Sequence, residues 1–289
     1  MKRRRRRSRT SLSVLAALLA AFAVGFLGGA LWRQPRPVPA DVAAREATPR
    51  PAPAPRETPR VPPRATPRPA GGRIALVIDD LGRRPSDLAA IAALGVPVAH
   101  AVLPYEPHSA AMAAAAAAAG AEVLLHLPME ALDGEDPGPG ALRLGMDDAA
   151  LAAATRAALA AVPEAVGINN HMGSALSADR RAMAVVLGVA RERGLFFLDS
   201  RTTAATVGFR LARELGVPAA ERQVFLDDSL SAADIEAELE RLRALALEEG
   251  SAIAIGHPHP VTFAQLAAEV PRAQAAGVRF VRLSELLAR

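Results

Sequence analysis

IALVIDD, at residues 74–80, is an uninterrupted aliphatic run that ends in two carboxylates. Five later apolar runs carry acidic or imidazole side chains at or near their ends: VLLHLPME (123–130), VGINNHMGS (166–174), LFFLDS (195–200), QVFLDDS (223–229) and IAIGHPHP (253–260). Buried parallel strands are continuous aliphatic runs, and the chemistry of such sheets gathers at the carboxyl ends of the strands. The repeated pattern therefore predicts one polar, metal-binding pocket at the carboxyl edge of a parallel sheet.

Strand-like and helix-like segments alternate through residues 73–289. We expect strands near residues 74–79, 97–103, 121–126, 165–169, 195–199, 223–226, 251–255 and 278–282. Helical patterns occupy residues 86–93, 108–119, 147–161, 178–193, 204–215 and 232–249. This alternation is typical of an α/β fold with a mostly parallel sheet. Seven to eight strands with intervening helices favour a regular or distorted (β/α) barrel over a smaller open sheet.

Residues 131–145, ALDGEDPGPGALRLG, interrupt this alternation directly after a strand that carries a candidate site residue. The segment is rich in glycine, proline and acids. Long loops at such positions commonly act on ligands. We therefore interpret it as a lid or a substrate-binding loop.

The first 72 residues differ from the rest of the chain. Residues 1–9 are basic, and residues 10–32 are uncharged and mostly apolar, about as long as the roughly 20 residues that span a bilayer. A cleaved signal peptide is the alternative, although its apolar part is normally shorter, roughly 7 to 15 residues. We expect a single-pass anchor in a bacterial inner membrane, with the domain facing the periplasm or exterior. Cleavage would leave the domain secreted.

Residues 33–72 contain 12 of the 24 prolines of the chain, mixed with Arg, Ala and Thr. That composition cannot bury a core and favours extended conformations. We predict a disordered linker that acts as a spacer, with a proline-rich docking ligand as the alternative. The linker would precede a folded domain at residues 73–289.

The charge of the predicted domain differs from that of the whole chain. Residues 1–72 hold 15 of the 34 Lys and Arg and 3 of the 30 Asp and Glu, which leaves 19 basic and 27 acidic residues in the domain. Nucleic-acid-binding domains normally carry a positive surface. We therefore expect no nucleic-acid partner. The chain has no cysteine, which excludes disulfides, thiolate metal sites and a Cys nucleophile.

Two carboxylates and two imidazoles are the strongest candidates for a metal site. Asp79 and Asp80 end the first run, whereas His126 and His171 follow two later strands. A lone histidine is most often structural, but the shared strand-end location favours ligation. Asp80, His126 and His171 would supply one oxygen and two imidazole nitrogens to Zn²⁺ or a similar divalent ion, with a position left for water.

Three further runs end in Asp199, in Asp227 and Asp228, and in His257. Asp227 and Asp228 also fit a helix N-cap before Ala232. Asp199 and His257 follow more apolar runs. A carboxylate beside an imidazole orients the ring and raises its basicity. We therefore predict that Asp199 and His257 take part in catalysis.

Together these segments resemble the polysaccharide deacetylase superfamily, and specifically its divergent branch. The likeness extends from about Ile74 to Leu287 and is carried by VIDDLG, LLHLPME, GINNHMGS, FFLDSRT, VFLDD, GHPHP and FVRLSELL in this order. The resemblance implies a distorted (β/α) barrel. It also implies metal-dependent removal of an N-acetyl or O-acetyl group from a glycan, with an acetylated glycan or cell-wall polysaccharide as substrate.

The family's motifs assign roles to the residues at matching positions. Asp79 matches the general base, Asp80 a metal ligand, His126 a metal histidine after the third strand, and His257 the catalytic acid. The resemblance implies that metal-bound water, deprotonated by Asp79, attacks the acetyl carbonyl while His257 protonates the leaving group. Mainstream members carry a second histidine four residues after the first, where this chain has Glu130.

The usual arginine and proline motif after the next strand is replaced here by NNHMGS. We therefore assign His171 as the substituting imidazole, with Glu130 as the fallback ligand. Asn169, Asn170 and Ser174 are candidates for hydrogen bonds to sugar or oxyanion, or for fixing a tight turn.

Two other classes of function compete with a deacetylase. A catalytically weak or inactive barrel would bind glycan or an envelope protein through the same pocket. A metal-dependent phosphoester hydrolase is disfavoured because the sequence has no Gly-rich phosphate loop and no clustered basic site. The sequence specifies neither the sugar nor a protein partner.

Overall fold

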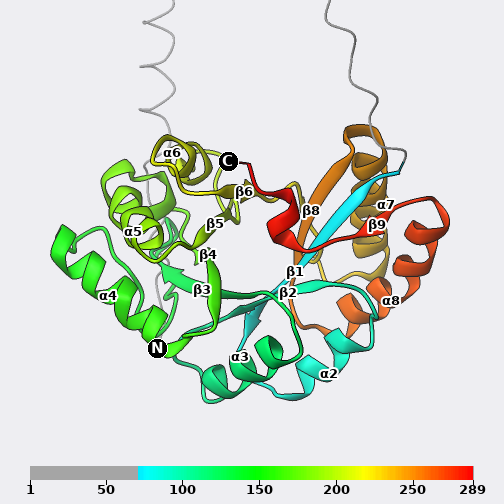
Figure 1. The fold of residues 1–289 in the computed structure, drawn as a ribbon, viewed down its shortest axis with the longest axis horizontal. Coiled ribbons are helices and arrows are strands. Elements are labelled where there is room, and N and C mark those ends of the chain that lie inside the picture. Colours follow the sequence, from blue (N-terminus) through cyan, green and yellow to red (C-terminus); the bar gives the residue numbers. More distant parts are fainter. Residues whose placement is uncertain (1–70, 289) are drawn as a thin grey trace, which may run out of the picture. The chain divides into compact units, whose positions relative to one another are not determined.

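The computed structural model describes residues 71–288, and within them nine strands form one sheet in which every paired neighbour is parallel (Figure 1). The strands are β1 (Arg73–Leu81), β2 (Val98–Val102), β3 (Val123–Met129), β4 (Ala165–Met172), β5 (Phe196–Asp199), β6 (Ala219–Glu221), β7 (Val224–Phe225), β8 (Ser251–Gly256) and β9 (Arg279–Phe280). The predicted basic segment, membrane anchor and linker up to residue 70 lie outside the described residues. No helix within residues 71–288 has the length and apolar character needed to cross a bilayer.

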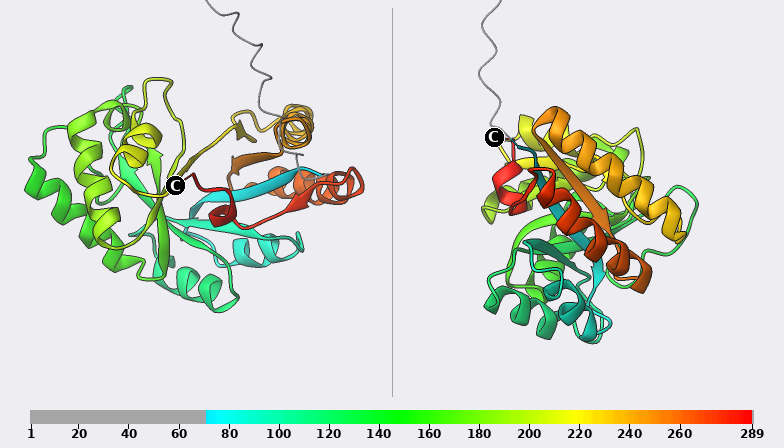
Figure 2. Two further views of the ribbon diagram at one scale, coloured as in Figure 1. Left: turned by 45° about the horizontal axis from the view of Figure 1, so that its top comes forward. Right: turned by 90° about the vertical axis from the view of Figure 1, so that its right-hand side faces the viewer.

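Helices connect most of the strands and lie on the outer face of the sheet (Figure 2). They are α2 (Ser86–Ala92), α3 (Ser109–Ala118), α4 (Asp148–Ala161), α5 (Arg180–Glu192), α6 (Gly208–Glu214), α7 (Ala232–Glu249) and α8 (Pro260–Ala275), with two short 3-10 helices, η1 (Leu176–Ala178) and η2 (Leu283–Leu286). The hydroxyl of Ser231 accepts a hydrogen bond from the backbone N–H of Asp234 and so caps α7. The N-cap interpretation of Asp227 and Asp228 is therefore wrong.

The two edge strands of the sheet are consecutive in the chain. The hydrogen-bonded order is β6-β5-β4-β3-β2-β1-β8-β7, and β9 pairs with the start of β1. Only Arg222 and Gln223 separate β6 from β7. Residues 219–225 thus run as one interrupted strand, which pairs first with β5 and then with β8. The sheet is therefore a curled, distorted barrel of parallel strands, and that part of the prediction is confirmed.

Side chains alternate between two cores along each strand, as the pleat of a β-strand requires. Ile74, Leu76 and Ile78 of β1 pack in the large cluster shared with the helices. Ala75 and Val77 pack in a smaller cluster with residues such as Leu124, Phe196, Leu198, Ile253 and Ile255 from other strands. The smaller cluster fills the inside of the curled sheet. This alternation also decides which strand-end side chains face the interior.

The C-terminal segment covers one end of the barrel. Leu283 of η2 belongs to the inner cluster, and its backbone N–H donates to Glu122, just before β3 begins. Ala288 pairs with Ala219 at the start of β6. Because these contacts lie at the starts of strands, the opposite end, where the strands finish, is left for a functional site.

The loop at residues 131–145 is fastened to its surroundings. The backbone of Leu142 bridges to Met129, and the carboxylate of Glu130 accepts a hydrogen bond of 2.7 Å from the backbone N–H of Leu144. Gly140 has φ 75°, and a Cβ atom there would lie 2.1 Å from Cε2 of Tyr105. The loop therefore packs closely on the segment that follows β2.

Gly140→Ala is expected to lower the free energy of unfolding. A left-handed backbone costs a residue with a Cβ about 1–2 kcal/mol, and the contact with Tyr105 adds a steric cost. Gly138→Ala is the matched control, because Gly138 has φ 92° and no atom lies within 4 Å of the place that a Cβ atom would take. Urea unfolding should show the larger loss for Gly140→Ala. Equal losses would contradict a role for the Tyr105 contact.

Candidate metal centre

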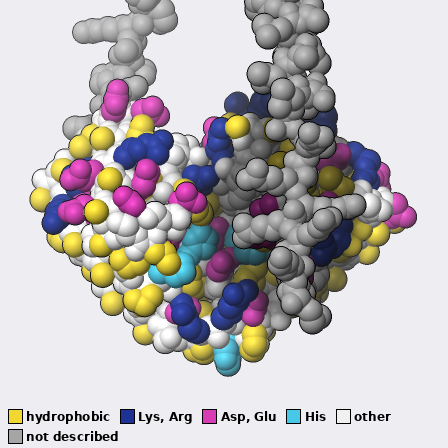
Figure 3. All heavy atoms as spheres, turned by 180° about the vertical axis from the view of Figure 1, so that it is seen from behind, with side chains coloured by type: hydrophobic (Ala, Val, Ile, Leu, Met, Phe, Trp, Pro, Cys, Tyr) yellow, Lys and Arg dark blue, Asp and Glu magenta, His cyan; other side chains and the backbone are white. Residues whose placement is uncertain are grey.

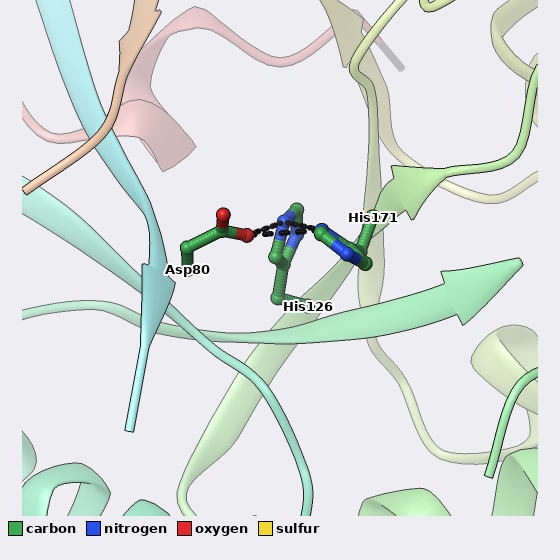
Figure 4. A group of neighbouring side chains, drawn as sticks. All are labelled: Asp80, His126 and His171. Atoms are coloured by element: carbon green, nitrogen blue, oxygen red, sulfur yellow. Dashed lines mark hydrogen bonds and ion pairs between the residues drawn. The ribbon is translucent and has the colours of Figure 1, made fainter. Parts of the chain in front are cut away.

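Asp80, His126 and His171 meet near the finishing ends of β1, β3 and β4 (Figure 4). Oδ1 of Asp80 lies 3.1 Å from Nε2 of His126 and 2.9 Å from Nδ1 of His171, and the two nitrogens are 3.1 Å apart. Histidine and acidic side chains lie together on this face of the domain (Figure 3). The three residues predicted as metal ligands are thus brought together.

The backbone of β1 explains why two successive carboxylates face the same pocket. In a regular strand Asp79 and Asp80 would point to opposite faces. Here the register between β1 and β2 shifts between Ile78 and Leu81, and Asp80 adopts φ 57°. Positive φ is uncommon outside glycine and concentrates at functional sites. The irregularity turns Asp80 toward His126, which also lies 3.6 Å from Oδ2 of Asp79.

The three donor atoms fit a divalent ion. Ligand atoms bound tetrahedrally about 2.0–2.2 Å from one zinc ion lie roughly 3.3 to 3.6 Å from each other, so the observed separations of 2.9–3.1 Å would have to open by only a few tenths of an ångström. Oδ1 of Asp80 is buried and has no hydrogen-bond partner, although two imidazole nitrogens are near it. A cation between the three atoms would satisfy this oxygen. One carboxylate and two imidazoles also suit zinc chemically.

Asn169 of β4 fixes the orientation of His126. Its amide nitrogen donates to Oδ1 of Asp79 at 2.9 Å, so its amide oxygen faces Nδ1 of His126 at 3.0 Å. In the neutral ring Nδ1 therefore carries the proton, and Nε2 is the atom that offers a lone pair to a metal. Such partners behind a ligand raise its basicity and hold its ring. Asn169 is fully buried, so it positions the site and does not face a substrate.

The two carboxylates of β1 differ in acidity. Burial raises the pKa of Asp79, and the charges of His126 and His257 offset only part of that effect. Burial acts in the same direction on Asp80, but the close contacts and the charges of the His126 and His171 imidazoles outweigh it and hold its pKa well below the usual range. Asp80 therefore stays ionised as a ligand should, whereas the more basic Asp79 suits proton acceptance.

His257, which follows β8, is paired with Asp227, which follows β7. Nδ1 of His257 lies 2.9 Å from Oδ1 of Asp227, and Oδ2 of Asp227 accepts from the backbone N–H of His257 and from the hydroxyl of Thr262, both at 2.7 Å. Burial lowers the pKa of His257, but the hydrogen bond to Asp227 and the charges of Asp79, Asp227 and Asp80 raise it to about 9. The imidazole is therefore protonated at neutral pH.

The His257–Asp227 pair makes the stability of the domain depend on pH. A histidine whose pKa rises from 6.5 to about 9 on folding stabilises the native state fully below pH 6.5. That contribution, up to about 3 kcal/mol, is lost as the pH rises through 9. Asp227→Asn should remove most of it. Urea unfolding of metal-free protein at pH 6 and pH 9.5 should show a smaller pH effect in Asp227→Asn than in the exposed control Asp228→Asn. An unchanged difference would contradict the pairing.

Asp199, which was predicted to take part in catalysis, forms its hydrogen bonds with the segment after β5. Its side chain points to the same face of β5 as the side chain of Phe197, which packs in the large cluster shared with the helices. Its carboxylate accepts hydrogen bonds from the hydroxyl of Thr206 and the backbone N–H of Phe209 at the start of α6. Asp199 therefore fastens the segment after β5, whereas Asp227 is the carboxylate that pairs with His257.

The other predicted site residues hold loops. Asn170 accepts from the backbone N–H of Ser200 and donates to the carbonyl of Met172. Ser174 accepts from the backbone N–H of Leu132 at 2.9 Å. The carboxylate of Glu130 accepts a hydrogen bond from the backbone N–H of Leu144 in the loop at residues 131–145, and Glu130 is not part of the three-residue cluster. Asn170 and Ser174 thus match the turn-fixing alternative, and the fallback ligand is not brought to the cluster.

The family model of the divergent polysaccharide deacetylases matches residues 76–287. This chain belongs to that family. The matched region contains the whole cluster around Asp80 and the His257–Asp227 pair. The family membership expected from the sequence motifs is confirmed.

Two curated relatives of this family member are uncharacterized proteins. The Escherichia coli (strain K12) protein YibQ is 43% identical over 191 residues, which cover 66% of this chain and 60% of YibQ. A Haemophilus influenzae protein is 39% identical over 199 residues, which cover 69% of this chain and 71% of that protein. This deacetylase-family chain thus spans less than two thirds of the length of YibQ.

Solved structures support the fold of the family domain. An uncharacterized protein from Agrobacterium tumefaciens C58 superposes with a TM-score of 0.69 at 24% identity, covering 75% of this chain and 89% of that chain. A family 4 carbohydrate esterase from Streptomyces lividans, solved in complex with acetate, gives a TM-score of 0.50 at 15% identity, covering 76% and 98% of the two chains. At these identities the likeness establishes the fold alone.

Proposed function

We propose that this chain is a metal-dependent deacetylase that hydrolyses an N- or O-acetyl group of a cell-envelope polysaccharide. One observation carries the proposal. A three-ligand cluster, a buried carboxylate of raised pKa and a carboxylate-paired histidine converge at the finishing ends of β1, β3, β4 and β8. Membership of the divergent polysaccharide deacetylase family supports an acetylated glycan as the substrate.

Asp80, His126 and His171 would hold the divalent ion, most simply Zn²⁺. When bound, such an ion polarises a carbonyl oxygen and lowers the pKa of a water molecule. The chain's contribution is to present one ionised carboxylate and two imidazole nitrogens. Asn169 holds the Nδ1 edge of His126, so that Nε2 faces the place that the ion would take.

Asp79 and His257 form the acid–base pair of this proposal. Asp79 accepts the proton that a nucleophilic water must lose, and burial, which raises its pKa, makes it a stronger base. His257 carries a proton, and because Nδ1 faces Asp227, Nε2 is the atom that donates to the leaving amine or alkoxide. A carboxylate that accepts a proton and an imidazolium that donates one are a usual basis of general acid–base catalysis.

The test is acetate release by the purified full-length chain loaded with zinc. Chitooligosaccharides, acetylated peptidoglycan and O-acetylated xylan would cover N- and O-acetyl substrates. We expect release from at least one of them and its loss after chelation. Tight zinc binding with no release from any substrate would overturn the deacetylase and favour the alternative, a barrel that binds glycan or an envelope protein through this pocket.

We also propose that residues 10–32 anchor the chain in the inner membrane with the domain in the periplasm. The basic residues 1–9 before this apolar segment favour that orientation. Fractionation should recover the chain from salt-washed membranes, and external protease should degrade the domain in spheroplasts. Recovery in the soluble periplasm at the size of a shortened chain would indicate a cleaved signal peptide.

A further inference from the structure

The interrupted strand between β5 and β8 is held on both sides by side chains. The break falls at Arg222 and Gln223, between β6 and β7. The side-chain oxygen of Gln223 accepts from the backbone N–H of Ile253 at 2.7 Å, while its backbone N–H donates to the carbonyl of Ile253. Gln223 therefore secures the break to β8, which leads directly into His257.

Arg222 secures the other side. Its Nε donates to the carbonyl of Ser200 at 2.7 Å, and its Nη2 donates to the carbonyl of Arg201 at 2.9 Å. Among residues 71–288 no carboxylate forms a salt bridge with Arg222, although Arg201 beside it is paired with Glu221. The half-buried guanidinium therefore binds two main-chain carbonyls after β5, and no salt bridge within residues 71–288 competes for it.

The same guanidinium lies over the ring of Phe225, 4.7 Å from the ring centroid. Phe225 in turn meets the imidazole of His257 edge to face, with centroids 5.2 Å apart and an interplanar angle of 79°. A continuous row of contacts therefore leads from Arg222 through Phe225 to His257, that is, from the end of β5 to the loop after β8. Cation–π and edge-to-face contacts both favour a defined ring geometry.

We propose that Arg222 is a positioning residue that fixes the orientation of the His257 imidazole through Phe225. Asp227 holds the imidazole at Nδ1, and the Phe225 ring contacts it from a second side. Arg222 in turn limits the movement of Phe225. The catalytic part of this inference rests on the proposed function, whereas the structural part does not.

The test combines kinetics with NMR of the full-length chain labelled at histidine. The chain has six histidines, and His257→Gln assigns the signal of His257. In Arg222→Met the ring-proton shifts of His257 should move toward those of a histidine free of an aromatic neighbour. A small displacement of a catalytic group lowers kcat by roughly 10- to 100-fold, with KM nearly unchanged. Arg222→Lys, which keeps the positive charge over Phe225, should recover part of both effects.

Arg213→Met is the matched control, because Arg213 also lies over a phenylalanine, Phe209, at 5.8 Å but without a histidine beyond it. It should change neither the His257 shifts nor kcat. Phe225→Leu should change the His257 shifts and kcat in the same way as Arg222→Met. The double variant should lower kcat no further than either single variant, as expected for residues that act in series. Circular dichroism checks that each variant is folded.

Several outcomes would overturn the proposal. They are unchanged His257 shifts in both Arg222→Met and Phe225→Leu, a fall in kcat without a change in those shifts, or additive effects in the double variant. If the wild-type chain releases no acetate, the proposed function fails, but the NMR shifts still test whether Arg222 and Phe225 orient His257.

Discussion

Asp80→Asn is expected to weaken zinc binding by the full-length chain more than roughly 100-fold, because loss of even an outer partner of a ligand typically costs 10- to 100-fold. The substitution preserves the size of the side chain but removes its charge. Oδ1 of Asp80 is the atom that faces both imidazole nitrogens. Competition with a chelating dye measures the affinity, and acetate release should fall with it.

Asp228→Asn is the matched control for this substitution. Asp228 is an exposed acid shortly after β7 and lies outside the three-residue cluster. It should leave both zinc affinity and acetate release unchanged. If Asp80→Asn bound zinc as tightly as the wild-type chain, the assignment of the metal centre would be wrong.

Asp79→Asn is expected to lower kcat by about 10²- to 10⁴-fold, the usual range for removal of a general base, while the chain keeps its zinc. An amide cannot accept the proton that the nucleophilic water must lose. The ligand His126 would stay in place, because Asn169 still holds its Nδ1 edge. Acetate release and metal content should be measured on the same sample.

Glu269→Gln provides the control for neutralising a buried acid. Glu269 is 5% exposed and paired with Arg243, away from the cluster. It should not change kcat. Loss of zinc together with activity in Asp79→Asn would contradict the separation of roles, because Asp79 would then act as a ligand.

The period of two along each strand accounts for most of the site once the structure shows which face of each strand is inward. His126 lies two residues after the inward-facing Leu124, and His257 lies two residues after Ile255. Asp199 instead lies two residues after Phe197, which faces the helices. Strand alternation therefore separates Asp199 from the inward-facing site residues, but residues 195–198 are apolar on both faces of the strand, so only the structure shows which face is inward.

Other parts of the site depend on features that strand periodicity cannot reveal. Asp80 reaches the metal ligands only because the backbone of β1 becomes irregular there, with φ 57°. Asp227 pairs with His257 because an interrupted strand brings β7 beside β8, and its two acids resembled a helix cap in sequence. The role of Asn169 depends on three side chains from three strands, which sequence spacing does not place.

More of the fold than of the chemistry could be predicted from the sequence. Aliphatic runs separated by helical patterns are enough to predict a parallel, distorted barrel. The boundaries differ where pairing is short. The strand expected at residues 278–282 is only Arg279–Phe280, because the chain then turns into η2 to pack Leu283 against the inner core.

The most direct measurement is X-ray diffraction at the zinc absorption edge from crystals of the full-length chain grown with zinc. We expect one strong anomalous peak about 2.0–2.2 Å from Oδ1 of Asp80, Nε2 of His126 and Nδ1 of His171. A strongest peak elsewhere in the molecule, or one that Glu130 binds in place of His171, would contradict the proposed metal centre.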